Sequence, residues 1–280
     1  MSRFRFAKGH GTGNDFVLLP DPDCALNLTP ELVRALCDRR RGIGADGVLR
    51  VVASAKHPES ASVADDAEWF MDYWNADGSI AEMCGNGIRV FARYLVDFGH
   101  ASADDLAVAT RSGVKQVRVD AVGVAADMGP PRFLGQSAAV VAGRRLVGAG
   151  VSMGNPHLVC QLPAAEVDAM DLSQPPRVDH AMFPHGVNVE FFGLLGPRHL
   201  KLRVHERGVG ETASCGTGVC AAAAVALRDA DQHTGEVTVE VPGGHLAVTL
   251  DSQTSWLAGP AVITAEGALT PQWLELEHAD

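Results

Sequence analysis

The sequence predicts an α+β protein that consists of two similar halves. Two observations point to the halves: a Cys-Gly-x-Gly string occurs twice, and a Gly-Asn pair precedes it both times. A third observation sets the class, because short strand-like segments punctuated by Gly and Pro outnumber the helix-forming runs. Since duplicated segments fold alike, each half is expected to wrap strands around one helix.

The repeated element covers residues 72–87 and 203–218. Each copy begins like a strand, continues through a polar loop that contains Gly, and ends in Cys-Gly-x-Gly. Helix-forming runs follow at 88–96 and 219–227. This order predicts a helix that begins directly after each cysteine.

Positions upstream of the two cysteines also correspond. Asn14 precedes Cys84 by 70 residues, and Asn155 precedes Cys215 by 60. The order is the same in both halves, which favours duplication over coincidence. We expect a first half at 1–127, completed by about residues 264–280, and a second half at 128–263.

The remaining elements follow from local patterns. A helix is expected over 30–41, with Thr29 as N-cap and Pro30 in the first helical position. Strands are expected at Val48–Val52, Val114–Val119, Arg145–Val151, Leu200–Val204, Val237–Val241 and Leu246–Leu250.

Composition limits the functional class. Of the 280 residues, 46% are hydrophobic, and the formal net charge is −11. An acidic chain is a poor partner for nucleic acid, although a local Arg or a helix N-terminus can still bind an acidic small molecule. No apolar N-terminal stretch resembles a secretory signal, and no segment is long enough to span a bilayer. We therefore expect a cytoplasmic protein without a disulfide framework.

A cysteine at the start of a helix is chemically useful. The unpaired N–H groups and the positive end of the helix dipole favour a thiolate, so the side chain can act as an acid or a base. The adjacent glycines let a ligand approach the backbone, whose N–H groups can bind a carboxylate. Two such turns can remove the α-proton of an amino acid and return a proton to the opposite face. The sequence therefore predicts a racemase or epimerase that uses Cys84 and Cys215.

Other interpretations of the cysteines were weighed. Cysteine often serves as a small buried hydrophobic residue, and this is the expected role of the remaining four cysteines. For Cys84 and Cys215, the matched glycine context favours chemistry. A disulfide between these two would be an oxidised form.

No cofactor or metal site is expected. Residues 42–47 match G-x-G-x-x-G but follow a predicted helix, not the strand that a dinucleotide site requires. No phosphate-binding loop or zinc-type cysteine spacing occurs. His157 lies inside a repeated block and is kept as a candidate assisting group.

Several strings together resemble the diaminopimelate epimerase family. They run in the family's order from residue 8 to residue 244. The strings are Lys8–Phe16, Asn75–Gly78, Met83–Gly87, Met153–His157, Gly186–Asn188, Glu206–Thr212, Cys215–Gly218 and Pro242–Gly244. The resemblance implies two pseudo-symmetric domains, each a strand barrel around a central helix, with the active site in the cleft between them. It also implies a homodimer that interconverts LL- and meso-2,6-diaminopimelate without pyridoxal phosphate, in lysine and peptidoglycan-precursor synthesis.

The same resemblance implies roles for individual residues. Cys84 and Cys215 match the catalytic cysteines. The matched substrate-binding residues are Gly85, Asn86, Gly216 and Thr217 for the reacting carboxylate, Glu206 and Arg207 for the reacting ammonium and the distal carboxylate, and Asn14, Asn75, Asn155 and Asn188 for the distal end. One position departs from the pattern, because many relatives have Gln where this chain has Gly47.

Two alternative functions were considered. A racemase of another amino acid on the same fold, related to proline racemase or a phenazine-pathway isomerase, would also keep the duplicated plan. The amides and Arg207 favour a substrate with a polar distal end, and the two cysteines disfavour the isomerase. A catalytically inactive scaffold is disfavoured because both cysteines are present.

Overall fold

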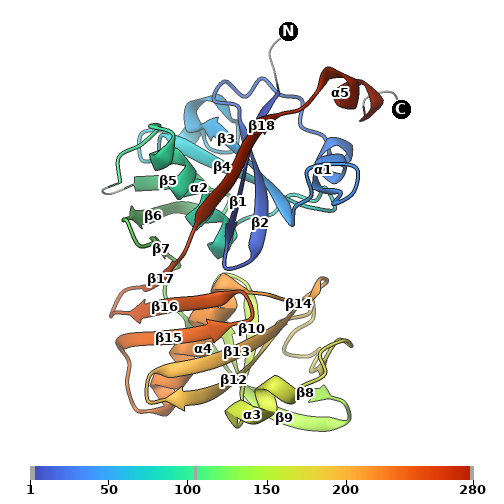
Figure 1. The fold of residues 1–280 in the computed structure, drawn as a ribbon. Helices are drawn as coiled ribbons and strands as arrows, with labels where there is room; N and C mark the ends of the chain where they lie inside the picture. The colour runs from blue at the N-terminus through green and yellow to red at the C-terminus, as the bar shows by residue number, and fades with distance from the viewer. Residues whose placement is uncertain (1–3, 104–105, 278–280) are drawn as a thin grey trace. The chain divides into compact units, whose positions relative to one another are not determined.

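The computed structural model describes residues 4–103 and 106–277 (Figure 1). The chain forms two compact units: unit 1 contains Met1–Ala126 and Pro260–Asp280, and unit 2 contains Asp127–Gly259. Among the described residues, no helix has both the length and the apolar character needed to cross a membrane.

Unit 1 is built from eight strands and three α-helices within the described residues. The strands are β1 (Arg5–Gly11), β2 (Asn14–Pro20), β3 (Gly47–Ala53), β4 (Trp69–Asn75), β5 (Leu106–Thr110), β6 (Gly113–Val119), β7 (Val124–Asp127) and β18 (Val262–Ala268). The helices are α1 (Pro30–Cys37), α2 (Gly85–Asp97) and α5 (Pro271–Glu277), with short 3₁₀ turns η1 (Ser54–Lys56) and η2 (Ala61–Val63).

Unit 2 contains ten strands and two α-helices. The strands are β8 (Arg132–Val141), β9 (Arg144–Ser152), β10 (Pro156–Gln161), β11 (Arg177–Val178), β12 (Asn188–Gly196), β13 (His199–Glu206), β14 (Gly210–Thr212), β15 (Gly235–Val241), β16 (Gly244–Leu250) and β17 (Ser255–Gly259). The helices are α3 (Ala164–Ala169) and α4 (Gly216–Asp229).

The two sheets have the same pairing pattern. In unit 1, neighbouring strands follow the order β18, β1, β2, β3, β4, β5, β6, β7; in unit 2, they follow the order β8, β9, β10, β12, β13, β15, β16, β17. The third and fifth pairings are parallel in both units, and the others are antiparallel. The predicted α+β class and the duplicated plan are confirmed.

Each sheet encloses one central helix. Helix α2 contacts β1, β2, β3, β4, β5, β6 and β18, and α4 contacts β9, β10, β12, β13, β15, β16 and β17. Four consecutive alanines, residues 221–224, are almost completely buried in α4. Small side chains let surrounding strands approach this helix on several sides, which explains why its sequence lacks a polar face.

Most local predictions agree with the structure. All six predicted strands lie within β3, β6, β9, β13, β15 and β16, and the two predicted post-cysteine helices lie within α2 and α4. Thr29 caps α1, because its Oγ1 accepts from the Leu32 N–H at 3.3 Å.

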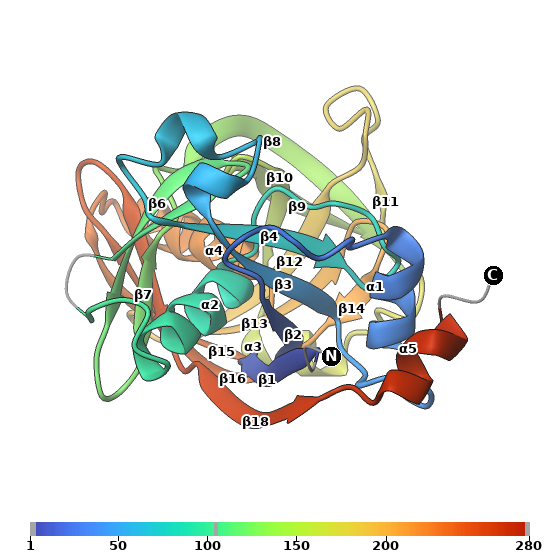
Figure 2. The same ribbon diagram turned by 90° about the horizontal axis from the view of Figure 1, so that it is seen from above.

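The predicted extension of α1 to Arg41 is wrong, because α1 ends at Cys37. Asp38 Oδ1 accepts from the N–H groups of Arg40 and Arg41, both at 2.8 Å, and thereby stabilises a turn in place of the last helical turn. In Figure 2, α1 and α5 lie side by side, and the indole N–H of Trp273 donates to Arg41 O at 2.8 Å.

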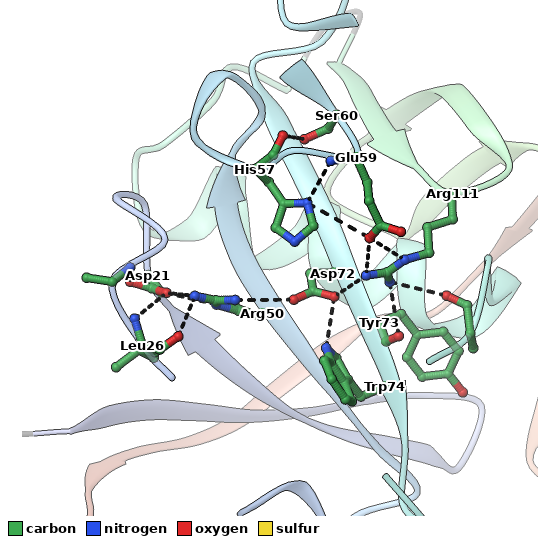
Figure 3. Close-up of polar contacts among 12 residues, drawn as sticks. Asp21, Leu26, Arg50, His57, Glu59, Ser60, Asp72, Tyr73, Trp74 and Arg111 are labelled. Atoms are coloured by element: carbon green, nitrogen blue, oxygen red, sulfur yellow. Dashed lines mark hydrogen bonds and ion pairs between the residues drawn. The ribbon is translucent and has the colours of Figure 1, made fainter. Parts of the chain in front are cut away.

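A chain of charged side chains, buried except for Glu59, connects elements of unit 1 (Figure 3). Arg50 lies between two carboxylates: it donates to Asp21 at 2.5 Å and lies 3.6 Å from Asp72. Arg111 also pairs with Asp72, at 2.7 Å, and with Glu59 at 2.7 Å. Because buried charges need partners, this chain specifies how β3 packs on β4.

Arg111 also holds the loop that leads to Cys84. Its Nη1 donates to the carbonyl oxygens of Tyr73 at 3.4 Å and Ala81 at 3.5 Å. The end of β4 and the loop after it are thus joined to the charge network. Both Asn75 and Cys84 belong to this segment.

Candidate active site

Cys84 occupies the N-cap of α2 in unit 1. Its backbone is extended, with φ −140° and ψ 123°, and its Sγ accepts from the Gly87 N–H at 3.4 Å. The side chain is half-buried. Gly85 and Asn86 form the first turn of α2, where backbone N–H groups have no partner within the helix. The sequence-predicted carboxylate-binding residues therefore lie at a helix N-terminus beside the thiol.

Asn14 contacts the Cys84 thiol. The distance from Cys84 Sγ to Asn14 Oδ1 is 3.6 Å, and Asn86 Nδ2 donates to the same oxygen at 3.2 Å. Asn14 Nδ2 donates to Asp46 Oδ2 at 2.8 Å. Because a carboxylate accepts only, Asp46 orients the amide so that its oxygen faces the thiol.

Asp46 belongs to a cluster of charged side chains from β1, β2 and the segment between α1 and β3. Arg39 binds Asp15 at 2.7 Å and Asp46 at 2.8 Å, while Lys8 binds Asp15 at 2.6 Å. Partial burial opposes ionisation of Asp15, but hydrogen bonds and charges from Arg39 and Lys8 outweigh it and hold the Asp15 pKa well below its usual range. This cluster keeps the Asp15 carboxylate ionised next to Asn14.

A fully buried arginine lies under the first turn of α2. Arg89 Nη1 donates to Gly85 O at 3.0 Å, and Nη2 donates to Thr12 Oγ1 at 3.2 Å and Asn86 Oδ1 at 3.1 Å. These contacts orient the Asn86 amide so that its nitrogen faces Asn14. Arg89 therefore supports the Cys84 site from the inside of unit 1.

Cys215 occupies the equivalent N-cap of α4 in unit 2, with φ −115° and ψ 110°. Its Sγ lies 3.5 Å from Thr217 Oγ1, and Asn188 Nδ2 donates to it at 3.9 Å. Gly216 and Thr217 begin α4 as Gly85 and Asn86 begin α2. Unlike Cys84, Cys215 is buried.

Burial raises the pKa of Cys215 well above its ordinary value, and the negative charges of Glu206 and Glu190 raise it further. The backbone hydrogen bond from Gly218 at the helix N-terminus lowers the Cys215 pKa, but burial and the two charges outweigh it, so the net effect favours the thiol. Burial likewise raises the pKa of the Glu206 carboxyl. A cationic ligand group near these residues would oppose both shifts.

A hydrogen-bonded chain leads from the interior of unit 2 to Cys215. Glu190 Oε1 lies 2.7 Å from His157 Nδ1, and both side chains are fully buried. His157 Nε2 lies 3.1 Å from Asn155 Oδ1, and Asn155 Nδ2 donates to Thr217 Oγ1 at 3.4 Å. The two ring nitrogens of His157 thus connect the buried Glu190 carboxylate to the Asn155 amide. Asn155 and His157 belong to one repeated block, and Cys215 belongs to another. The hydrogen-bonded chain connects these two blocks of unit 2 through Thr217.

Glu206, Arg207 and Asn188 come together next to this chain. Thr212 Oγ1 donates to Glu206 Oε1 at 2.5 Å, and the Arg207 N–H donates to Asn188 Oδ1 at 2.9 Å. The Arg207 guanidinium donates to His185 O at 3.1 Å. The Asn188 amide is therefore oriented with its nitrogen toward Cys215.

The remaining cysteines divide into two groups. Cys37, Cys160 and Cys220 are buried as expected, and burial raises the pKa of Cys37 and Cys160 to about 12. The prediction of burial is wrong for Cys24, which is half-buried in a turn with φ +55° where its N–H donates to Asp21 O at 3.0 Å. Within residues 4–103 and 106–277, no cluster of three or more His, Cys, Asp or Glu side chains is arranged to hold a metal ion.

Sequence reasoning missed five residues that support the two cysteines. They are Thr12, Asp46, Arg89, Glu190 and Thr212. Two of them carried a usable signal, since Arg89 and Glu190 are charged residues within apolar runs, and charged side chains are rarely buried without a partner.

Comparison with known proteins agrees with this geometry. A model of the diaminopimelate epimerase family matches residues 6–134 and 150–267. The chain is 53% identical over 286 residues to the diaminopimelate epimerase of Streptomyces coelicolor, with 98% of each chain covered. It is 49% identical over 282 residues to that of Rhodococcus opacus, covering 96% of this chain and 98% of the relative.

Solved structures of lower identity share the fold. A phenazine biosynthesis protein of the PhzF family from Bacillus anthracis aligns with a TM-score of 0.69 and 17% identity, over 96% of this chain and all of the other. A probable proline racemase from Agrobacterium radiobacter aligns with a TM-score of 0.69 and 14% identity, over 96% and 93%. The family model and the full-length relatives together show that the chain belongs to the diaminopimelate epimerase family.

Proposed function

We propose that this protein is an isomerase that interconverts LL- and meso-2,6-diaminopimelate through proton transfer by Cys84 and Cys215. Family membership supports the substrate. The observation that carries the chemistry is the equivalence of the two half-sites: each unit places a cysteine at the N-cap of its central helix. In unit 1 an asparagine from the β1–β2 turn contacts the thiol, and in unit 2 the corresponding Asn155 reaches it through Thr217.

The proposed reaction conserves protons. One cysteine, as thiolate, takes the α-hydrogen of the substrate as a proton and becomes a thiol. The electron pair stays on the α-carbon, and backbone N–H groups at a helix N-terminus stabilise the charge that spreads into the carboxylate. The other cysteine, as thiol, delivers its proton to the opposite face of the carbon and becomes a thiolate. The proposal therefore requires both cysteines to face one substrate carbon.

Because burial raises the pKa of Cys215, this cysteine is suited to act as the acid in one direction. Glu206 lies close enough to raise the Cys215 pKa by its charge. A substrate ammonium bound by Glu206 would neutralise that charge. Substrate binding would then favour ionisation of a cysteine at the time it is needed.

The experiment follows the isotope at the inverted carbon. Purified protein is incubated with LL-diaminopimelate in heavy water, and early product is analysed by mass spectrometry and NMR. Two-base transfer predicts solvent deuterium in the early product and little in the remaining substrate, in both directions. Early product that retains its α-hydrogen would contradict the two-cysteine assignment, and absence of any epimerisation would contradict the proposed substrate.

The alternative substrate class is tested in the same assay. Proline, 4-hydroxyproline and lysine should not be racemised at rates comparable to diaminopimelate. We further propose that the protein works in the cytoplasm as a homodimer, and family membership is the support for both statements. Light scattering coupled to size exclusion should give about twice the 29.5 kDa chain mass.

A further inference from the structure

Gly47 lies beside a tyrosine that leaves no room for another side chain. Gly47 is paired with Asn75 across β3 and β4. A Cβ atom at Gly47 would lie 2.6 Å from Trp74 O and 2.9 Å from Tyr73 Cε2. Both distances are shorter than real Cβ contacts, so a larger residue would displace the tyrosine ring or the β4 backbone.

The Tyr73 ring is held in place from a second direction. It is 9% exposed and packs edge-on against Phe16, with ring centroids 6.0 Å apart and planes at 78°. Tyr73 and Asn75 are two residues apart on one strand and therefore point to the same face of the sheet. The hydroxyl of Tyr73 reaches Asn75 Oδ1 at 2.8 Å.

The hydrogen bonds of the following turn define the direction of this contact. Ser79 Oγ donates to Asp77 Oδ1 at 2.6 Å, because a carboxylate accepts only. Hydrogen bonds from the Ser79 side chain and backbone hold the pKa of Asp77 below its usual range. The Ser79 oxygen then accepts from Asn75 Nδ2 at 3.0 Å. The amide oxygen of Asn75 must face Tyr73, whose hydroxyl donates.

We propose that Tyr73 is a positioning residue, which fixes the Asn75 amide so that its second N–H is presented to a carboxylate of the substrate. The proposal rests on the proposed function and on the role that the family resemblance implies for Asn75, which is to bind the distal end of diaminopimelate. An amide can present either its oxygen or its nitrogen, and only the nitrogen attracts a carboxylate. The Tyr73 ring can occupy this position only because Gly47 has no side chain, so the two residues act together to position Asn75.

The test removes one oxygen atom from the protein. Tyr73→Phe keeps the ring against Gly47 and Phe16 but loses the bond to Asn75. Because the distal contact is made equally in the ground state and the transition state, KM for LL-diaminopimelate should rise about three- to ten-fold, while kcat changes less than about two-fold. Tyr94→Phe is the matched control: Tyr94 is the other tyrosine of the chain, is buried in α2 and stacks on Phe98. It should leave both constants unchanged.

Two further measurements separate positioning from a general structural effect. In an Asn75→Ala background, Tyr73→Phe should have no additional effect on KM, because there is no amide left to orient. In the ligand-free protein, Tyr73→Phe should shift the NMR signals of the Asn75 side-chain amide, and Tyr94→Phe should not.

The outcomes are distinguishable. If the NMR signals of the Asn75 side-chain amide are unchanged in Tyr73→Phe, the proposal is wrong, whichever substrate the enzyme uses. If the wild type epimerises diaminopimelate, then unchanged kinetics in Tyr73→Phe, a loss confined to kcat, or an undiminished effect in the Asn75→Ala background also overturn it. If the wild type does not epimerise diaminopimelate, the proposed function fails, and the amide signals still decide whether Tyr73 orients Asn75.

Discussion

Replacing Glu190 by Gln should weaken unit 2 and misalign the residues next to Cys215. Glu190 and His157 are fully buried, and their 2.7 Å contact joins a carboxylate to an imidazole ring. Glutamine keeps the shape but replaces the charged acceptor of His157 by a neutral one. The loss is therefore that of a charge-assisted hydrogen bond, about 1.5–3 kcal/mol of unfolding free energy.

The effect on activity follows from the hydrogen-bond chain. A weaker contact at Nδ1 would hold the His157 ring less firmly and disturb its contact with Asn155 Oδ1, which lies 3.1 Å from Nε2. The Asn155 amide would then rotate, and Thr217 would lose the donor that orients its hydroxyl toward Cys215. If the whole loss of about 1.5–3 kcal/mol is added to the activation free energy of proton transfer at Cys215, kcat should fall about 10- to 150-fold, since about 1.36 kcal/mol corresponds to a factor of ten.

Three measurements check this reasoning. Nitrogen NMR should show that the ring signals of His157 change in Glu190→Gln. Urea unfolding should show the loss of stability, and the epimerisation assay should show the loss of kcat. Glu240→Gln is the matched control, because His199 and Glu240 form a His–Glu pair at 2.8 Å with side chains 41% and 32% exposed. That pair should contribute less than about 1 kcal/mol. Unchanged His157 ring signals, or equal effects of the two substitutions, would refute the argument.

Four other predictions can be tested directly. Cys84→Ala and Cys215→Ala should each reduce epimerisation by about 10²–10⁴-fold or more in both directions, and a variant with near-normal rates would argue against the two-base assignment. Arg207→Lys should lower kcat/KM about ten-fold or more through loss of two-pronged carboxylate binding, whereas unchanged kinetics would mean that Arg207 does not bind substrate. Protein dialysed against chelator should keep its activity, and activity restored only by added metal would contradict the cofactor-free mechanism. Finally, burial raises the pKa of Cys160 to about 12. The folded protein therefore favours the neutral thiol, and the free energy that this thiol contributes to stability is complete below about pH 9 and is lost as the pH rises toward 12. Over that window, the unfolding free energy of the wild type should fall by up to about 1.4 kcal/mol per pH unit, and that of Cys160→Ala should fall less steeply. Equal slopes of unfolding free energy against pH in the two proteins would contradict the burial effect.

The duplicated plan and the two cysteines could be predicted from the sequence because they rest on local signals. Glycine next to cysteine, followed by a helix-forming run, marks a helix start wherever it occurs. The extended segments before each cysteine likewise follow from the alternation and punctuation of nearby residues. Among the predicted helices and strands, the end of α1 differs from the structure, because the Asp38 side chain replaces helical hydrogen bonds by a turn.

The contacts of Asp46 and Glu190 could not be predicted, because the partners of these two residues are distant in sequence. Asp46 is 32 residues from Asn14, and Glu190 is 33 residues from His157. Such pairs meet only when strands of one sheet align, as β10 and β12 place His157 beside Asn188.

Tertiary structure also decided the ionisation of Cys215. The helix N-terminus favours a thiolate by local geometry alone. Burial and the charges of Glu206 and Glu190 outweigh it, since removing a charge from water costs more than a partial dipole returns. Sequence thus determined which groups take part, whereas packing determined their orientation and charge, because desolvation and hydrogen-bond direction depend on all neighbours at once.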